Sequence, residues 1–139
     1  MTRRSSAVSR RSSRLTVALL AALCLFGCGD DGATEPQPQP GQLRVILSGG
    51  TAPAGAVVLT VTGPGISSPV PAGGAALYHD LAGGTLSAVV VGASLGGEIL
   101  RFSVSDVNQI ASYAASMRQV AGPDNFLLEA GGFTVAVVR

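Results

Sequence analysis

The chain has 139 residues, with nine basic residues, eight acidic residues and one histidine, and a net charge of +1. This length leaves room for one ordinary domain. All nine basic residues are arginines, and five of them precede residue 15, so removal of residues 1–27 leaves four arginines against eight acids, a net charge of −4. A domain of that charge lacks the persistent basic patch that binds nucleic acid, which excludes this class of partner.

The first 27 residues have the layout of an export signal. Residues 1–14 are basic and contain no acid, and residues 15–27 form an uncharged apolar run. A basic segment followed by 7–15 apolar residues is typical of a secretory signal peptide. As a helix the run would span roughly 20 Å, less than the ~30 Å hydrocarbon core of a membrane, so we predict a signal peptide and not a permanent transmembrane helix.

The end of the apolar run predicts a lipid anchor. Leu25, Phe26, Gly27 and Cys28 resemble the bacterial lipobox, a Leu-x-small-Cys pattern. The resemblance implies that Cys28 receives a covalent lipid and becomes the first residue of the mature chain. The alternative is an ordinary secreted protein in which Cys28 is a cysteine of the apolar run. Gly29 follows Cys28 where enteric inner-membrane lipoproteins carry aspartate, which favours the outer membrane over the inner one.

Residues 28–42 predict a disordered tether. This stretch has no apolar periodicity and cannot bury enough surface to fold. Its Pro-Gln alternation at 36–40 favours extended polyproline II, a semi-rigid spacer of ~3.1 Å per residue. We therefore expect a spacer that holds the domain away from the membrane, in preference to a proline-rich recognition ligand.

Residues 43–139 predict an all-β domain, a small antiparallel β-sandwich. Leu100, Phe102 and Val104 alternate with Arg101 and Ser103, as in a strand with one buried face. Five Gly-Gly pairs and several Gly/Pro clusters fall between the apolar runs, where tight turns need positive φ. The expected strands are 42–47, 56–62, 75–79, 85–91, 98–104, 113–120, 125–129 and 133–138. Residues 106–117 are the only helix-permissive stretch, and we expect a loop or one short turn there, capped by Asp106, because the sequence from Tyr113 onward also fits a strand.

Three segments of this domain resemble a known class of protein. Residues 62–66, 84–91 and 98–106 are similar to strands and turns of uncharacterised bacterial lipoproteins that carry a small immunoglobulin-like or cohesin-like sandwich. The resemblance extends over most of residues 43–139. It implies a fold, and it implies no activity.

The domain has few residues that could support catalysis, and we expect that this protein is not an enzyme. His79 is the one histidine, and both cysteines fall before the domain, so a zinc site lacks its ligands. A hydrolase that uses His79 is the less favoured alternative, because no Gly-x-Ser-x-Gly motif is present and the side chains of His79 and Asp80 would diverge on a strand.

Calcium is the one metal with candidate ligands. Asp106, Asn108, Asp124 and Asn125 supply oxygen atoms, but the EF-hand pattern fails after its second position. We favour turn and cap roles for these four residues, and so predict no metal and no cofactor other than the lipid on Cys28.

These observations together predict a lipid-anchored cell-envelope protein with a non-catalytic domain. Its expected role is interaction or structure, with an envelope protein as partner, because strand edges can add a further strand. The alternative is a small-ligand or glycan-binding module. Stacking on sugars needs exposed aromatic rings, and Tyr78 and Tyr113 are the only tyrosines.

Overall fold

The predicted all-β domain is observed as nine strands in two antiparallel sheets, a small β-sandwich. The computed structural model describes residues 36–139. The predicted signal peptide, the lipobox with Cys28 and the first part of the tether lie outside the described residues. Among residues 36–139, no helix is long and apolar enough to span a membrane.

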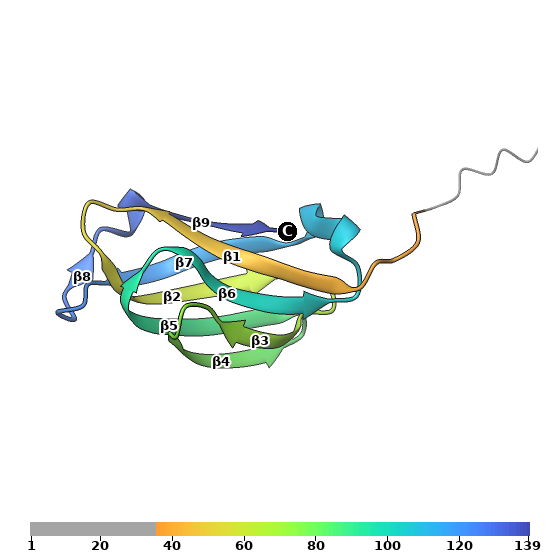
Figure 1. Ribbon diagram of the computed structural model, residues 1–139, viewed down its shortest axis with the longest axis horizontal. Coiled ribbons are helices and arrows are strands. Elements are labelled where there is room, and N and C mark those ends of the chain that lie inside the picture. Colours follow the sequence, from red (N-terminus) through yellow and green to blue (C-terminus); the bar gives the residue numbers. More distant parts are fainter. Residues whose placement is uncertain (1–35) are drawn as a thin grey trace, which may run out of the picture. The chain divides into compact units, whose positions relative to one another are not determined.

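The two sheets contain four and five strands (Figure 1). The first has the order β3-β6-β1-β9 and the second the order β4-β5-β2-β7-β8. Two short 3-10 segments, η2 (Val107–Ser112) and η3 (Ala130–Gly132), join strands at opposite ends of the sandwich. The strands are β1 (Gly41–Gly49), β2 (Ala54–Thr62), β3 (Ser67–Pro71), β4 (Ala76–Ala82), β5 (Thr85–Leu95), β6 (Gly97–Val104), β7 (Ala114–Ala121), β8 (Leu127–Leu128) and β9 (Phe133–Val138).

The core lies between the central strands of the two sheets and confirms the predicted alternation. Phe102 of β6 is fully buried and is the largest of the completely buried side chains, while its neighbours Arg101 and Ser103 are half-buried on the other face. Each such apolar side chain contributes about 1.5–3 kcal/mol when it is fully buried. The inward-facing residues are Leu43, Val45 and Leu47 of β1, Leu100, Phe102 and Val104 of β6, Val57, Leu59 and Val61 of β2, and Leu86, Ala88 and Val90 of β5.

One strand was not predicted. The segment Ser67–Pro71 contains Pro69 and Pro71, which the sequence analysis treats as loop residues. In the structure it forms the edge strand β3, paired with β6 through Ser67, Val70 and Pro71, with a register shift between the first two. Proline lacks the N–H that a central strand must donate, so it is tolerated at a sheet edge or bulge. The prolines thus mark an edge and not the absence of a strand.

Two further expectations need correction near the C-terminus. Only Leu127 and Leu128 of the predicted strand 125–129 pair with β7, because Asn125 adopts a left-handed φ of 65° in the preceding turn. Gly131 and Gly132 are not a tight hairpin turn as expected, and they form part of η3. In each of the other four Gly-Gly pairs, at least one glycine has positive φ, as predicted.

The folded domain begins slightly before the predicted boundary at residue 43. Strand β1 starts at Gly41, which pairs with Val104 of β6, so Gly41 and Gln42 belong to the sheet and not to the tether. Gln39 is also bound to the domain, because its carbonyl accepts a hydrogen bond from the Val107 N–H at 2.8 Å. Pairing with β6 offsets the weak strand propensity of Gly41.

Candidate functional site

The end of the sandwich opposite to the tether, called the distal end below, carries the most exposed apolar side chains. The described tether enters β1 beside η2, whereas β8 and η3 lie at the other end (Figure 1). The nine residues of β1 alone separate the two ends by about 30 Å, at ~3.3 Å per residue. The distal end therefore faces away from the point where the chain enters the domain.

A tight turn between β7 and β8 displays two of these side chains. The Gly122 N–H donates to the Phe126 carbonyl at 2.9 Å, and the Asp124 carboxylate accepts from the Phe126 N–H at 3.2 Å. These bonds close the loop and leave Phe126 and Leu127 pointing outward, 72% and 71% exposed. The turn therefore displays two large apolar side chains beside the exposed Asp124.

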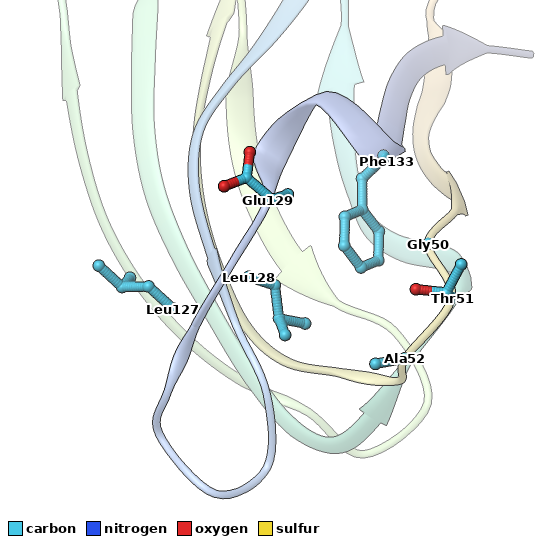
Figure 2. A pocket seen from close by; sticks show the side chains of 8 residues that line it. Gly50, Thr51, Ala52, Leu127, Leu128, Glu129 and Phe133 are labelled. Atoms are coloured by element: carbon cyan, nitrogen blue, oxygen red, sulfur yellow. The ribbon is translucent and has the colours of Figure 1, made fainter.

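A cleft of about 500 Å³ adjoins this turn (Figure 2). The Phe133 ring lies between the β1–β2 connection and the side chain of Leu128, while Leu127 points away from both (Figure 2). We call Phe126 together with the lining of this cleft the distal surface. The residues that line the cleft are Gly50, Thr51, Ala52, Leu127, Leu128, Glu129, Gly132 and Phe133.

Gly50 shapes this cleft by allowing a close approach. It has a φ of +82°, and a Cβ atom added there would lie 2.2 Å from Cε1 of Phe133. Its N–H donates to the Gly132 carbonyl at 2.7 Å, which ties the β1–β2 connection to η3. Any other residue would meet both left-handed strain and a clash with the ring, so this glycine permits the observed position of Phe133.

The distal surface has an acidic character. Among the described residues that connect strands at this end, 50–53, 72–75, 96 and 122–132, the charged side chains are Asp124 and Glu129, and none is basic. Glu129 lines the cleft itself. An apolar surface bordered by carboxylates complements an apolar segment flanked by lysine or arginine.

The four candidate calcium ligands do not come together. Asp106 and Asn108 lie at η2, and Asp124 and Asn125 lie in the β7–β8 turn, with the length of β7 between the two pairs. No group of three or more His, Cys, Asp or Glu residues that could hold a metal ion occurs within residues 36–139. The Asp106 carboxylate instead accepts from the Asn108 N–H at 2.9 Å and caps η2, as the sequence predicts.

Asp106 also fixes the start of the folded domain. Its Oδ1 accepts from the Gln39 N–H at 3.0 Å, so one carboxylate joins the end of the tether to η2. These two backbone donors, with smaller help from the side chains of Gln109 and Asn108, hold the pKa of Asp106 below its usual value, against the opposing effect of burial. Hydrogen bonds to the ionised form lower the pKa in this way.

Replacing Asp106 with asparagine is expected to destabilise the domain at neutral pH and to matter less in acid. Because the pKa of Asp106 is lowered on folding, its contribution is present in full above about pH 4 and is lost as the pH falls through the folded value. Urea unfolding of both proteins at neutral and acidic pH measures this effect. A difference between them that does not change with pH would contradict it.

The structure places His79 and Asp80 next to each other on the edge strand β4. His79 pairs with Ala88 and Asp80 pairs with Ser87, so the two side chains lie on opposite faces of β4, as predicted. Among the described residues no hydrogen bond joins His79 to a hydroxyl or a carboxylate. His79 lines a shallow hollow of about 350 Å³ that also includes Tyr78, Asp80 and Arg118.

The two tyrosines have different environments. Tyr113 is buried, its hydroxyl donates to the Pro64 carbonyl at 2.6 Å, and its ring centroid lies 5.9 Å from that of Phe102. Burial and the charge of Asp106 raise the pKa of Tyr113. Tyr78 is 66% exposed on β4. Tyr113 therefore cannot serve as a platform for a sugar, and Tyr78 is the one tyrosine that remains for that role.

No local pattern in the sequence predicts the distal surface. Phe126 and Leu127 were assigned to a strand, although the preceding Gly-Pro-Asp-Asn turn was a signal that they follow a tight loop. Comparison with known proteins finds no family model, curated protein or solved structure that matches this chain.

Proposed function

We propose that this protein is a bacterial lipoprotein that is held to a membrane of the cell envelope, the outer one in bacteria that have two, by a lipid on Cys28. Its domain is non-catalytic and binds another envelope protein. The sequence of residues 1–28 supports the anchor. One structural observation supports the binding role, namely that the exposed Phe126 and Leu127 adjoin an apolar cleft at the end of the domain opposite to its tether.

The position of the distal surface fits such a role. A tether that enters at one end leaves the other end free to meet a partner. Exposed aromatic and aliphatic side chains beside a cleft are the features that supply most of the binding energy in protein interfaces. The carboxylates of Asp124 and Glu129 add selectivity, because they favour a partner with lysine or arginine beside its apolar residues and disfavour an acidic one.

The test compares proteins that co-purify with the full chain from envelope extracts. We expect the double variant Phe126→Asp with Leu127→Asp to lose its partner, because two charges then occupy the apolar contact. The matched control is Val70→Asp with Val91→Asp, which adds the same charge at other exposed apolar positions. The control is expected to retain the partner.

Two results would contradict the proposal. In one, the distal double variant recovers the same proteins in the same amounts as the wild type. In the other, both double variants lose the partner together, which would indicate a general effect of added negative charge. Thermal unfolding of all three proteins shows whether the fold is intact, and exposed positions usually change stability by no more than about 0.5 kcal/mol.

A further inference from the structure

Strand β4 is an open edge of the five-stranded sheet. All seven of its residues pair with β5 without a register shift. Among the described residues no strand pairs with its other side, which borders the domain in Figure 1. In an antiparallel pair every second residue directs its backbone N–H and C=O away from the partner strand, so β4 presents a row of unpaired donors and acceptors.

The other sheet edges are blocked or short, whereas β4 is not. Edge strand β3 carries two prolines and a register shift, and β8 contains only two residues. The third edge, β9, lies against β7. Strand β4 has no proline and no bulge, two of the usual means by which proteins prevent edge-to-edge pairing, and its one charged residue is Asp80.

The sequence of β4 is close to a palindrome centred on His79. It reads Ala-Leu-Tyr-His-Asp-Leu-Ala from residue 76 to residue 82. In an antiparallel pair of identical strands related by a two-fold axis at His79, Leu77 of each copy lies opposite Leu81 of the other. Tyr78 lies opposite Asp80 in the same way, and the two alanines face each other. Such an arrangement is self-complementary, as a two-fold interface must be.

We infer that β4 pairs with β4 of a second copy of this chain, in antiparallel orientation and with His79 at the two-fold axis. The pairing joins the two five-stranded sheets into one continuous sheet. It brings Leu77 and Leu81 together and places the Tyr78 hydroxyl beside a carboxylate that can accept its hydrogen bond. This surface is separate from the distal surface, and the inference does not depend on the proposed function.

The neighbouring registers are less favourable. Two directly opposed residues lie on the same face of the sheet. The two-fold axis must therefore pass through a residue and not between two residues, so the nearest alternative axes lie at residues 78 and 80. An axis at residue 80 places Asp80 opposite Asp80, and like charges in that position are destabilising. An axis at residue 78 separates Leu77 from Leu81 and leaves Asp80 opposite an alanine. The charge pattern of β4 therefore selects the register centred on His79.

The resulting dimer is expected to be weak. A pair of seven-residue strands buries less than the roughly 1,600 Å² of a standard stable interface. Covalent capture is therefore the appropriate measurement, and it reports the register directly. We choose the full chain in non-ionic detergent with Cys24 and Cys28 replaced by serine, because an introduced cysteine is then the only thiol.

In this background His79→Cys is expected to form a disulfide-linked dimer under mild oxidation. Directly opposed Cα atoms lie about 4.5–5.5 Å apart, within the range that a disulfide spans. Tyr78→Cys alone is the matched control, because it would lie diagonally to its own copy at about 7–8 Å and it keeps the Asp80 charge that selects the register. It is not expected to cross-link by itself, but it is expected to cross-link to Asp80→Cys in a mixture of the two.

Several outcomes would overturn the inference. If His79→Cys does not cross-link, β4 does not pair in this register. If Tyr78→Cys cross-links with itself as well as His79→Cys does, the thiols meet by random collision. If the mixture behaves like its separate components, the two strands are not antiparallel around His79.

A second measurement needs no cysteine. Sedimentation of the full chain over a range of concentrations is expected to show a monomer–dimer equilibrium. His79→Lys would place two permanent charges opposite each other and should lower the dimer fraction, whereas His79→Thr should retain it. A wild-type chain that stays monomeric as its concentration rises, or a lysine variant that dimerises equally, contradicts the pairing.

Discussion

Replacing Phe102 with alanine is expected to lower the free energy of unfolding by about 3–5 kcal/mol, the usual cost of truncating a buried phenylalanine. Phe102 has no exposed surface and lies in the middle of the core between the sheets. Its loss leaves a cavity that the surrounding strands can fill only in part, and it removes the contact with the Tyr113 ring. Both effects lower the free energy of unfolding.

The size of this effect matters because residues 36–139 contain no disulfide. The two cysteines of the chain are at positions 24 and 28, so packing alone stabilises the domain. With a typical total of 5–15 kcal/mol, the variant is expected to lose a large part of its stability. Urea unfolding measures the change. The matched control is Phe126→Ala, which truncates an exposed ring and should change stability by no more than about 0.5 kcal/mol.

Equal stability of the two alanine variants would contradict the observed core. It would mean that Phe102 does not pack between the sheets, or that Phe126 is buried in solution. A cost well above 5 kcal/mol would indicate that the variant collapses the sandwich as a whole, since truncation of one ring does not account for so much.

Replacing Cys28 with serine is expected to abolish the incorporation of labelled fatty acid and to leave residues 1–27 attached, because cleavage ahead of Cys28 follows its lipidation. The proposed lipid is the only strong membrane contact of the mature chain, whereas the variant keeps the apolar run of residues 15–27. Serine cannot carry the lipid through a thioether. The variant therefore lacks the acyl chains and the anchoring that they supply. Detergent phase partitioning and incorporation of labelled fatty acid measure the change.

Cys24→Ser provides the matched control for the anchor. Cys24 lies four residues earlier in the same apolar run, and its replacement should leave both lipid labelling and membrane location unchanged. A Cys28→Ser protein that stays in the membrane with its first residues intact would show that the uncleaved apolar run holds it there. If both variants fail to incorporate the labelled fatty acid, the lipid cannot be assigned to Cys28 alone.

The identity of most strands could be predicted because it depends on local patterns. Leu100, Phe102 and Val104 alternate with polar neighbours, and this alternation alone indicates which face is buried. The cap at Asp106 was predicted for the same reason, since it depends on backbone donors within three residues. The missed strand β3 shows the limit of such reasoning, because proline excludes a central strand but permits an edge, and no local signal distinguishes the two.

Whether distant residues meet could be predicted less well. The four calcium candidates lie at two ends of the sandwich because the strand β7 separates the two loops that carry them. The predicted strand 113–120 already contained this information, since a single strand joins opposite ends of a sheet. The distal cleft offered no such signal. It arises where the β1–β2 connection passes against η3, and Gly50 and Phe133 are 83 positions apart in the sequence.

The sequence by itself therefore determined that this chain forms a light, aliphatic β-sandwich with short Gly-rich turns, because side-chain alternation and turn chemistry act over a few residues. Only the tertiary structure decided which strands are edges. The near-palindrome of β4 is visible in the sequence, yet it has meaning for assembly only because β4 lies at the border of its sheet with one side unpaired. Strand order depends on contacts between distant segments, and local preferences do not specify those contacts.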